Sequence, residues 1–203
     1  LSGSPSQLQI GIALGVYGLT QAAFQIPFGM SSDLYGRKKV IYFGLAIFVL
    51  GSIIAGASTQ IEGIIIGRAI QGAGAISAVL TALLSDLTRD EHRTKAMAIV
   101  GASIGLTFAL SLVISPWLND KIGVSGIFFM MGILSILAAI VIHLFVHEPK
   151  RTNKKIVLKL KDFYAVLWRL DLGRLNLGIF VLHVAQISMF MVVPFYLIQQ
   201  GNL

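Results

Sequence analysis

The chain has 203 residues, of which 56% are hydrophobic and only 12% charged, and its mean hydropathy is +0.83. Soluble domains carry roughly 25% charged residues, so this chain has too little polar surface for a soluble, disordered or nucleic-acid-binding protein. It contains no cysteine, which excludes disulfides and thiolate chemistry within it. Its 21 glycines suit closely packed membrane helices. The composition therefore predicts a membrane protein.

Apolar stretches long enough to cross a bilayer recur along the chain, each near the length of about 20 helical residues that a crossing needs. Most are apolar on all sides, as expected for helices that face lipid or other helices. Short connections make sequential neighbours antiparallel. The six stretches cover residues 8–30, 40–58, 61–85, 96–118, 124–146 and 175–198. We expect an all-α, polytopic transmembrane helix bundle.

The basic residues lie almost entirely on one side of these stretches. Fourteen of the 16 Lys and Arg residues fall in the loops 31–39, 86–95 and 147–174. The other side keeps only Lys121, and one arginine lies inside a stretch. Because basic loops stay cytoplasmic, we place these three loops in the cytoplasm and residues 1–7 outside. The net charge of +7 is then explained by these loops, which are attracted to anionic lipid headgroups, and does not indicate binding to nucleic acid.

One connection differs in composition from the rest of the chain. After Glu148 and Pro149 a basic run begins, and residues 156–170 place apolar side chains at helical spacing. This pattern predicts an amphipathic helix on the cytoplasmic surface, with a plain tether as the alternative. We expect three parts, residues 1–148, 149–174 and 175–203. Because the chain starts at Leu1 without Met, we interpret it as a piece of a longer protein.

The first cytoplasmic loop combines glycines with charges of both signs. Asp33 and Arg37 stand four residues apart, within reach of one another. Gly29 and Gly36 permit close packing and a tight turn. A carboxylate at this place can pair with the arginine or cap a helix N-terminus. An ordinary basic loop is the alternative, but it accounts only for the cations.

An arginine lies inside the third stretch. Arg68 stands seven residues after Ile61, roughly 10 Å into the stretch at 1.5 Å per residue. A guanidinium at this depth costs at least about 2.5 kcal/mol unless it is paired or hydrated, which makes Arg68 a functional candidate. A purely structural arginine bonded to backbone carbonyls is the alternative. Gly72 and Gly74 would let a neighbouring helix approach closely.

These two segments resemble the signatures of the major facilitator superfamily. Residues 29–38 match the pattern glycine-x-x-x-aspartate-x-x-glycine-arginine-lysine, and residues 68–74 match arginine-x-x-glutamine-glycine-x-glycine. The run 85–95 resembles the drug-efflux branch of the family. The resemblance implies two six-helix halves around a central substrate path. In that general-transporter fold the chain would hold helices 2–7 of 12, with residues 1–148 as the first half without its first helix.

The resemblance also implies roles for single residues. Asp33, Arg37 and Asp86 would form a cytoplasmic charge cluster that stabilises the outward-open state, and protonation of one carboxylate would weaken it. A charge–dipole contact of about 0.3–2 kcal/mol is enough to shift a balanced two-state equilibrium. Arg68 would assist proton transfer. The proton is then the coupling ion, and no other cofactor is expected.

The sequence departs from the family pattern in two places. Ser31, Ser32 and Leu34 stand where the first signature has leucine, alanine and arginine. Of the antiporter signature only Gly101 and Gly105 remain, which we interpret as helix-packing glycines. These departures weaken the case for export rather than import and leave the resemblance to the superfamily unaffected.

A few polar, aromatic and sulfur-containing side chains inside the stretches are candidates for an adaptable apolar path. His183 either contacts substrate or makes an interhelical hydrogen bond. No group of His, Asp or Glu has metal-ligand spacing, and no nucleophile stands beside a base. The path candidates are Gln21, Phe24, Gln25, Phe108, His183 and Met189.

These observations lead to a functional hypothesis. We expect a secondary transporter of the bacterial inner membrane that exports drug-like small molecules in exchange for protons and acts as a monomer in the lipid bilayer. A proton-coupled importer of sugars or other metabolites is the alternative within the family. A sensor that transports nothing is an alternative on the same fold. No feature of the sequence predicts an enzyme.

Overall fold

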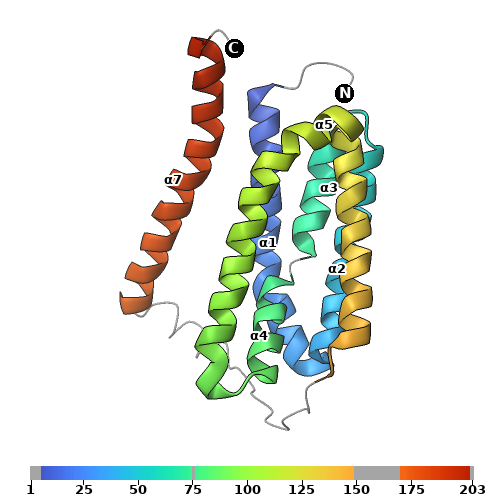
Figure 1. Ribbon diagram of the computed structural model, residues 1–203, viewed down its shortest axis with the longest axis vertical. Helices are drawn as coiled ribbons and strands as arrows, with labels where there is room; N and C mark the ends of the chain where they lie inside the picture. The colour runs from blue at the N-terminus through green and yellow to red at the C-terminus, as the bar shows by residue number, and fades with distance from the viewer. Residues whose placement is uncertain (1–5, 75, 149–169, 202–203) are drawn as a thin grey trace. The chain divides into compact units, whose positions relative to one another are not determined.

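The structure, a computed structural model, describes residues 6–74, 76–148 and 170–201. These residues form helices and contain no strand, which confirms the all-α fold predicted from composition. The chain divides into two units, residues 1–151 and 152–203, which are described separately. The elements are α1 (Gln7–Tyr35), α2 (Arg37–Ala57), α3 (Ile61–Ala73), α4 (Ser77–Leu87), η1 (Asp90–His92), α5 (Arg93–Phe145) and α7 (Leu170–Gly201) (Figure 1).

The helices of the first unit run up and down past one another (Figure 1). Among the described residues, four segments are long and apolar enough to cross a membrane, namely Leu8–Tyr35, Arg37–Ala57, Ile61–Leu87 and Asp90–Phe145. The last segment has 56 residues. A helix of that length measures about 84 Å, more than twice the roughly 30 Å of a hydrocarbon core. It therefore supplies two crossings, as the sequence predicts.

Gly123 separates these two crossings. Its backbone has φ 67° and ψ 177°, a conformation outside the helical region that glycine adopts without a Cβ clash. In Figure 1 the ribbon of α5 turns back at one end of the unit. The helix extends on both sides of Gly123, so the loop that we expected at 119–123 is reduced to a turn at one residue.

The expected single helix at 61–85 is corrected by the structure to two. α3 ends at Ala73, and α4 begins at Ser77. At the end of α3 the Gly74 N–H is shared between the carbonyls of Ile70 (3.2 Å) and Gln71 (3.1 Å). Gly72 and Gly74 both weaken helix propagation, since glycine costs about 1 kcal/mol relative to alanine in a helix. The third crossing is therefore a broken helix.

Close contact of backbones joins α2 to α3. A methyl group placed on Gly51 would lie 2.6 Å from both Gln71 N and Gly67 O, and one on Gly67 would lie 2.7 Å from Ala55 N. At Gly72, a methyl group would overlap Thr20 Oγ1 and Tyr17 O of α1. The packing predicted for Gly72 and Gly74 is found, since Gly74 also lies against α2. Small residues therefore bring three helices together, as in other membrane bundles.

The buried core lies near the end of the first unit where α1 meets α2. Partly buried side chains from the end of α5 pack against it. Elsewhere large apolar side chains are exposed along the helices, which suits a surface in contact with lipid. The core consists of Phe28, Val40, Ile41, Leu45, Val79 and Leu83.

The second unit contains α7, which covers the stretch expected at 175–198. The amphipathic helix predicted for residues 156–170 lies outside the described residues, apart from Leu170 at the start of α7.

Candidate cytoplasmic charge cluster and buried arginine

The first feature of the site is the turn between α1 and α2. Gly36 alone separates the two helices, with φ 104° and ψ 143°, and its N–H donates to Ser32 O at 3.1 Å. A side chain at this φ would be strained, so the glycine explains the sharpness of the turn. The tight turn predicted from the loop is present, and it sets Arg37 at the first position of α2.

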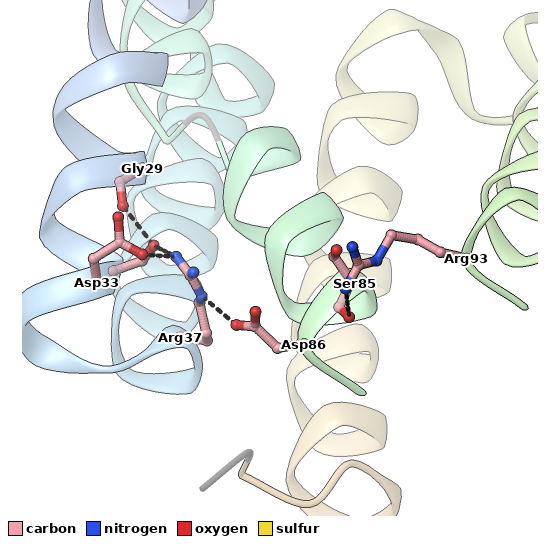
Figure 2. A network of polar contacts seen from close by, with 7 residues as sticks. Gly29, Asp33, Arg37, Ser85, Asp86 and Arg93 are labelled. Atoms are coloured by element: carbon pink, nitrogen blue, oxygen red, sulfur yellow. Dashed lines mark hydrogen bonds and ion pairs between the residues drawn. The ribbon is translucent and has the colours of Figure 1, made fainter. Parts of the chain in front are cut away.

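Arg37 joins three helices (Figure 2). Its Nη1 lies 2.6 Å from Asp33 Oδ1 at the end of α1, and its Nε lies 2.9 Å from Asp86 Oδ2 on α4. The Arg37 side chain is 17% exposed, against 53% for Asp33 and 41% for Asp86. The structure thus brings the three residues of the expected charge cluster into direct contact. Because the arginine is the more buried partner, it depends on both carboxylates for charge compensation.

A serine completes the hydrogen bonding of Arg37. The Ser32 hydroxyl accepts from Arg37 Nη1 and donates to Gly29 O, each at 2.6 Å, and the residue is 2% exposed. Gly29 thus contributes its carbonyl. A methyl group at Gly29 would meet nothing within 4 Å among the described residues, so the close packing expected there is not seen. Sequence reasoning missed Ser32, which it treated only as a departure from the family pattern.

The other cytoplasmic loops meet at the same end of the unit. Arg93, at the start of α5, donates to Ser85 O at 3.3 Å (Figure 2). It also pairs with Asp90 at 2.7 Å. Lys38 donates from Nζ to Val146 O at 2.8 Å, at the far end of α5. The Lys38 contact joins the 31–39 loop to the end of the fifth predicted span, and the Arg37–Asp86 pair joins the same loop to the 86–95 loop. The prediction that the basic loops share one side is therefore confirmed for their described parts.

Arg68 is held by neutral groups. Its guanidinium lies over the Tyr17 ring, with Cζ 4.3 Å from the centroid. Nη1 donates to Gln71 Oε1 at 3.2 Å, and Nε donates to Ala13 O at 3.5 Å. Among the described residues no carboxylate contacts it. The arginine therefore faces the α1–α3 interface, where a cation–π contact compensates part of its desolvation.

Gln71 extends the hydrogen bonding of Arg68 to α2. It is fully buried, and its Nε2 donates to Ser52 Oγ at 2.8 Å. The Ser52 hydroxyl in turn donates to Phe48 O at 2.8 Å. A continuous chain of hydrogen bonds therefore runs from Arg68 on α3 to the backbone of α2. Only the spacing of Arg68 and Gln71, three residues apart, could have suggested the first link.

A cavity of about 450 Å³ opens beside the break between α3 and α4. Its wall combines polar side chains, among them Tyr17, Gln21 and Gln71, with apolar groups of α2 and α5. Of the four path candidates in the first unit, Gln21 lines it. Phe24 lies instead edge-on to Phe28, with ring centroids 6.5 Å apart.

The remaining candidates lie in two different units and are described one by one. Gln25, Phe108 and Met189 have exposed side chains. The His183 Nδ1 is 2.9 Å from Ile179 O, one turn earlier in α7, so this bond lies within its own helix.

Two further expectations concern glycines and metals. Nothing lies within 4 Å of a methyl group at Gly101 or Gly105, so the packing expected of them is not seen among the described residues. The described residues also contain no cluster of three or more His, Asp or Glu side chains that could hold a metal ion.

Comparison with known proteins decides the family. The sequence profile of the Major Facilitator Superfamily matches residues 2–203. The chain belongs to this superfamily. It is a multi-pass membrane protein, and the fold implied by its two signatures is confirmed in the helical bundle described above.

Individual relatives of this superfamily member carry the names of transporters. The chain is 47% identical over 199 residues to the inner membrane transport protein YajR of Escherichia coli K12, a match that covers 97% of this chain and 44% of that protein. It is 34% identical over 114 residues (54% and 22% coverage) to multidrug resistance protein 3 of Bacillus subtilis. It is 31% identical over 135 residues (66% and 28% coverage) to a uridine/deoxyuridine transporter of Lactococcus lactis. The chain thus spans less than half the length of these relatives, whose names describe transport and no enzyme.

Proposed function

We propose that the complete protein is a secondary active transporter of the bacterial inner membrane, working as a monomer. It exports drug-like small molecules in exchange for protons by alternating access. Its parts would be residues 1–148 from the first helical half, a cytoplasmic linker at 149–174 and the first helix of the second half at 175–203. The proposal extends the superfamily assignment to direction, substrate class and coupling ion.

The contact that carries this proposal is the double ion pair of Arg37. One guanidinium holds carboxylates from α1 and α4 at the cytoplasmic ends of the helices, with distances of 2.6 and 2.9 Å. Such a contact stabilises one arrangement of the helix ends and is lost when a carboxylate takes up a proton, so it can couple protonation to a change of state. Arg68 supports the proposal as a second polar centre, deeper in the bundle, in the role of assisting proton transfer.

Export of drug-like compounds is favoured by the multidrug resistance protein among the relatives. A cavity wall that mixes tyrosine, glutamine and apolar groups also suits amphipathic compounds better than polyhydroxylated ones. Import of a metabolite is the second candidate, because one relative is named as a nucleoside transporter and most of the antiporter signature is missing.

Everted membrane vesicles containing the full-length protein test the proposal. Ethidium and tetraphenylphosphonium serve as probes, with uridine as the competing metabolite. We expect an imposed proton gradient, acidic inside, to drive uptake of a cationic probe, and addition of that probe to dissipate the gradient. The Asp33→Asn variant should lose both effects. Proton-driven movement of uridine in the opposite direction would replace export by import, and no flux of any compound would favour a sensor.

A further inference from the structure

Arg37 and Lys38 are consecutive residues of the signature loop, yet they hold different helices. Arg37 binds the carboxylates of α1 and α4, as described above. Lys38 donates to Val146 O at 2.8 Å, 108 residues further along the chain. Both lie in the first turn of α2, directly after the glycine turn at Gly36. The start of α2 is therefore the point at which the charge cluster meets the end of α5.

The Lys38 contact lies at a place where a helix needs a cation. α5 ends at Phe145, and the Val146 N–H still donates to Ile142 O at 3.2 Å. The last carbonyls of a helix lack helical partners and carry partial negative charge. A lysine ammonium that donates to one of them satisfies an orphan acceptor and favours the helix dipole. The lysine thus caps the C-terminal end of α5 from another helix.

A second contact between the same two helices lies one turn away. The ring centroids of Tyr42 on α2 and His143 on α5 are 6.3 Å apart. Tyr42 lies four residues after Lys38, and His143 lies three residues before Val146. Ile142 and Val146 also pack against the buried core cluster. The end of α5 is therefore fixed to α2 by a ring contact and one charged hydrogen bond, and its apolar side chains pack against the core cluster to which α1, α2 and α4 contribute.

We propose that Lys38 is a positioning residue that makes the cytoplasmic end of α5 follow α2 when the charge cluster rearranges. Release of Arg37 from Asp33 and Asp86 removes the ion pairs that join α2 to α1 and α4, whereas Lys38 keeps Val146 attached to α2. The chain leaves α5 at this point toward the connection that leads to α7, so the position of that exit depends on α2. The role in turnover rests on the transporter function proposed above, but the contact itself does not.

The test uses the full-length protein with Lys38→Met, which keeps the length and apolar stem but removes the ammonium group. Lys38→Arg retains a donor, and Lys39→Met is the matched control, because Lys39 is a neighbouring exposed cation without a bonded partner among the described residues. Hydrogen exchange at amides 143–148 is followed by mass spectrometry. Flux of the cationic probe in everted vesicles gives kcat and KM.

We expect Lys38→Met to speed exchange at 143–148 by about fivefold, the size typical of a lost charge–dipole contact at a helix end. It should lower kcat of transport while KM stays unchanged, because probe binding is not touched. Lys38→Arg should restore both values, and Lys39→Met should change neither. If the exchange rate at 143–148 is unchanged in Lys38→Met, the Lys38–Val146 contact does not stabilise this helix end and the proposal is wrong. Faster exchange with unchanged kcat overturns the positioning role and leaves a purely structural cap. If the unmodified protein moves no probe, the proposed transport fails, whereas exchange still decides the contact.

Discussion

Arg37 Nε and Asp86 Oδ2 are 2.9 Å apart although 49 residues separate them in the sequence. The same guanidinium binds Asp33 through Nη1. An arginine presents its donors as a rigid fork, which is why one side chain can hold two carboxylates from different helices. A lysine has a single charged nitrogen and cannot reproduce this geometry.

We therefore predict that Arg37→Lys reduces probe flux in everted vesicles by about fivefold, corresponding to loss of roughly 1 kcal/mol from one of the two ion pairs. Arg93→Lys is the control, since Arg93 and its partner Asp90 are 46% and 87% exposed and make an ordinary surface pair. Flux in Arg93→Lys should stay within experimental error. Equal losses in both variants would show that cytoplasmic cations in general, and not the shared arginine, limit transport.

Ser32 provides a second prediction, because its buried hydroxyl accepts from Arg37 and donates to Gly29 O. Ser32→Ala removes the acceptor and leaves a half-buried guanidinium N–H without this partner. The cost of such a group is about 1–3 kcal/mol. We expect a lower midpoint of thermal unfolding for the purified full-length protein. Ser31→Ala, which removes a hydroxyl with no hydrogen bond among the described residues, should leave the midpoint unchanged. A midpoint unaffected by Ser32→Ala would contradict the role of this hydroxyl.

The sequence was sufficient for the parts of this structure that depend on local pattern. Apolar length predicts the crossings, and the distribution of Lys and Arg predicts that loops around Arg37 and Arg93 share one side. The spacing of Asp33 and Arg37 predicts their ion pair, since residues four apart are neighbours near a helix end. In contrast, Asp86 entered the charge cluster only through the family resemblance, because no local rule pairs residues on different helices.

Apart from the packing at Gly72 and Gly74, features that depend on the approach of two helices could not be predicted. Gly44 and Gly51 carry no special signal in a stretch rich in glycine, yet they lie against α3 and the residues that follow it. In the sequence, the segment around Gly74 is part of an uninterrupted apolar stretch. Hydropathy does not show where two backbones are in contact, so it does not predict the break in the helix. In the sequence, Ser32 stands out only as a departure from the family pattern. Its hydrogen bond to Arg37 is found only in the structure.

The close approach of α2 and α3 gives a third prediction. A methyl group on Gly51 would lie 2.6 Å from the backbone atoms Gln71 N and Gly67 O, which cannot rotate away. Gly51→Ala should therefore separate the two helices and destabilise the protein by about 1–3 kcal/mol, the usual cost of overpacking. The measurement is the thermal unfolding midpoint of the full-length protein. Gly15→Ala is the control, since nothing lies within 4 Å of a methyl group there. Equal midpoints for the two variants would contradict the backbone contact.

The last prediction separates the charge of Arg68 from its geometry. The guanidinium lies over the Tyr17 ring, with Cζ 4.3 Å from the centroid, and donates to Gln71. Arg68→Lys keeps the charge but loses the guanidinium that makes both contacts, so we expect flux to fall by about thirtyfold if each contact contributes near 1 kcal/mol. Tyr17→Phe retains the aromatic face and should transport normally, whereas Tyr17→Leu removes only the ring contact and should lower flux by about fivefold. Normal flux in both Arg68→Lys and Tyr17→Leu would assign the arginine to electrostatics alone, because any cation at that depth would then suffice.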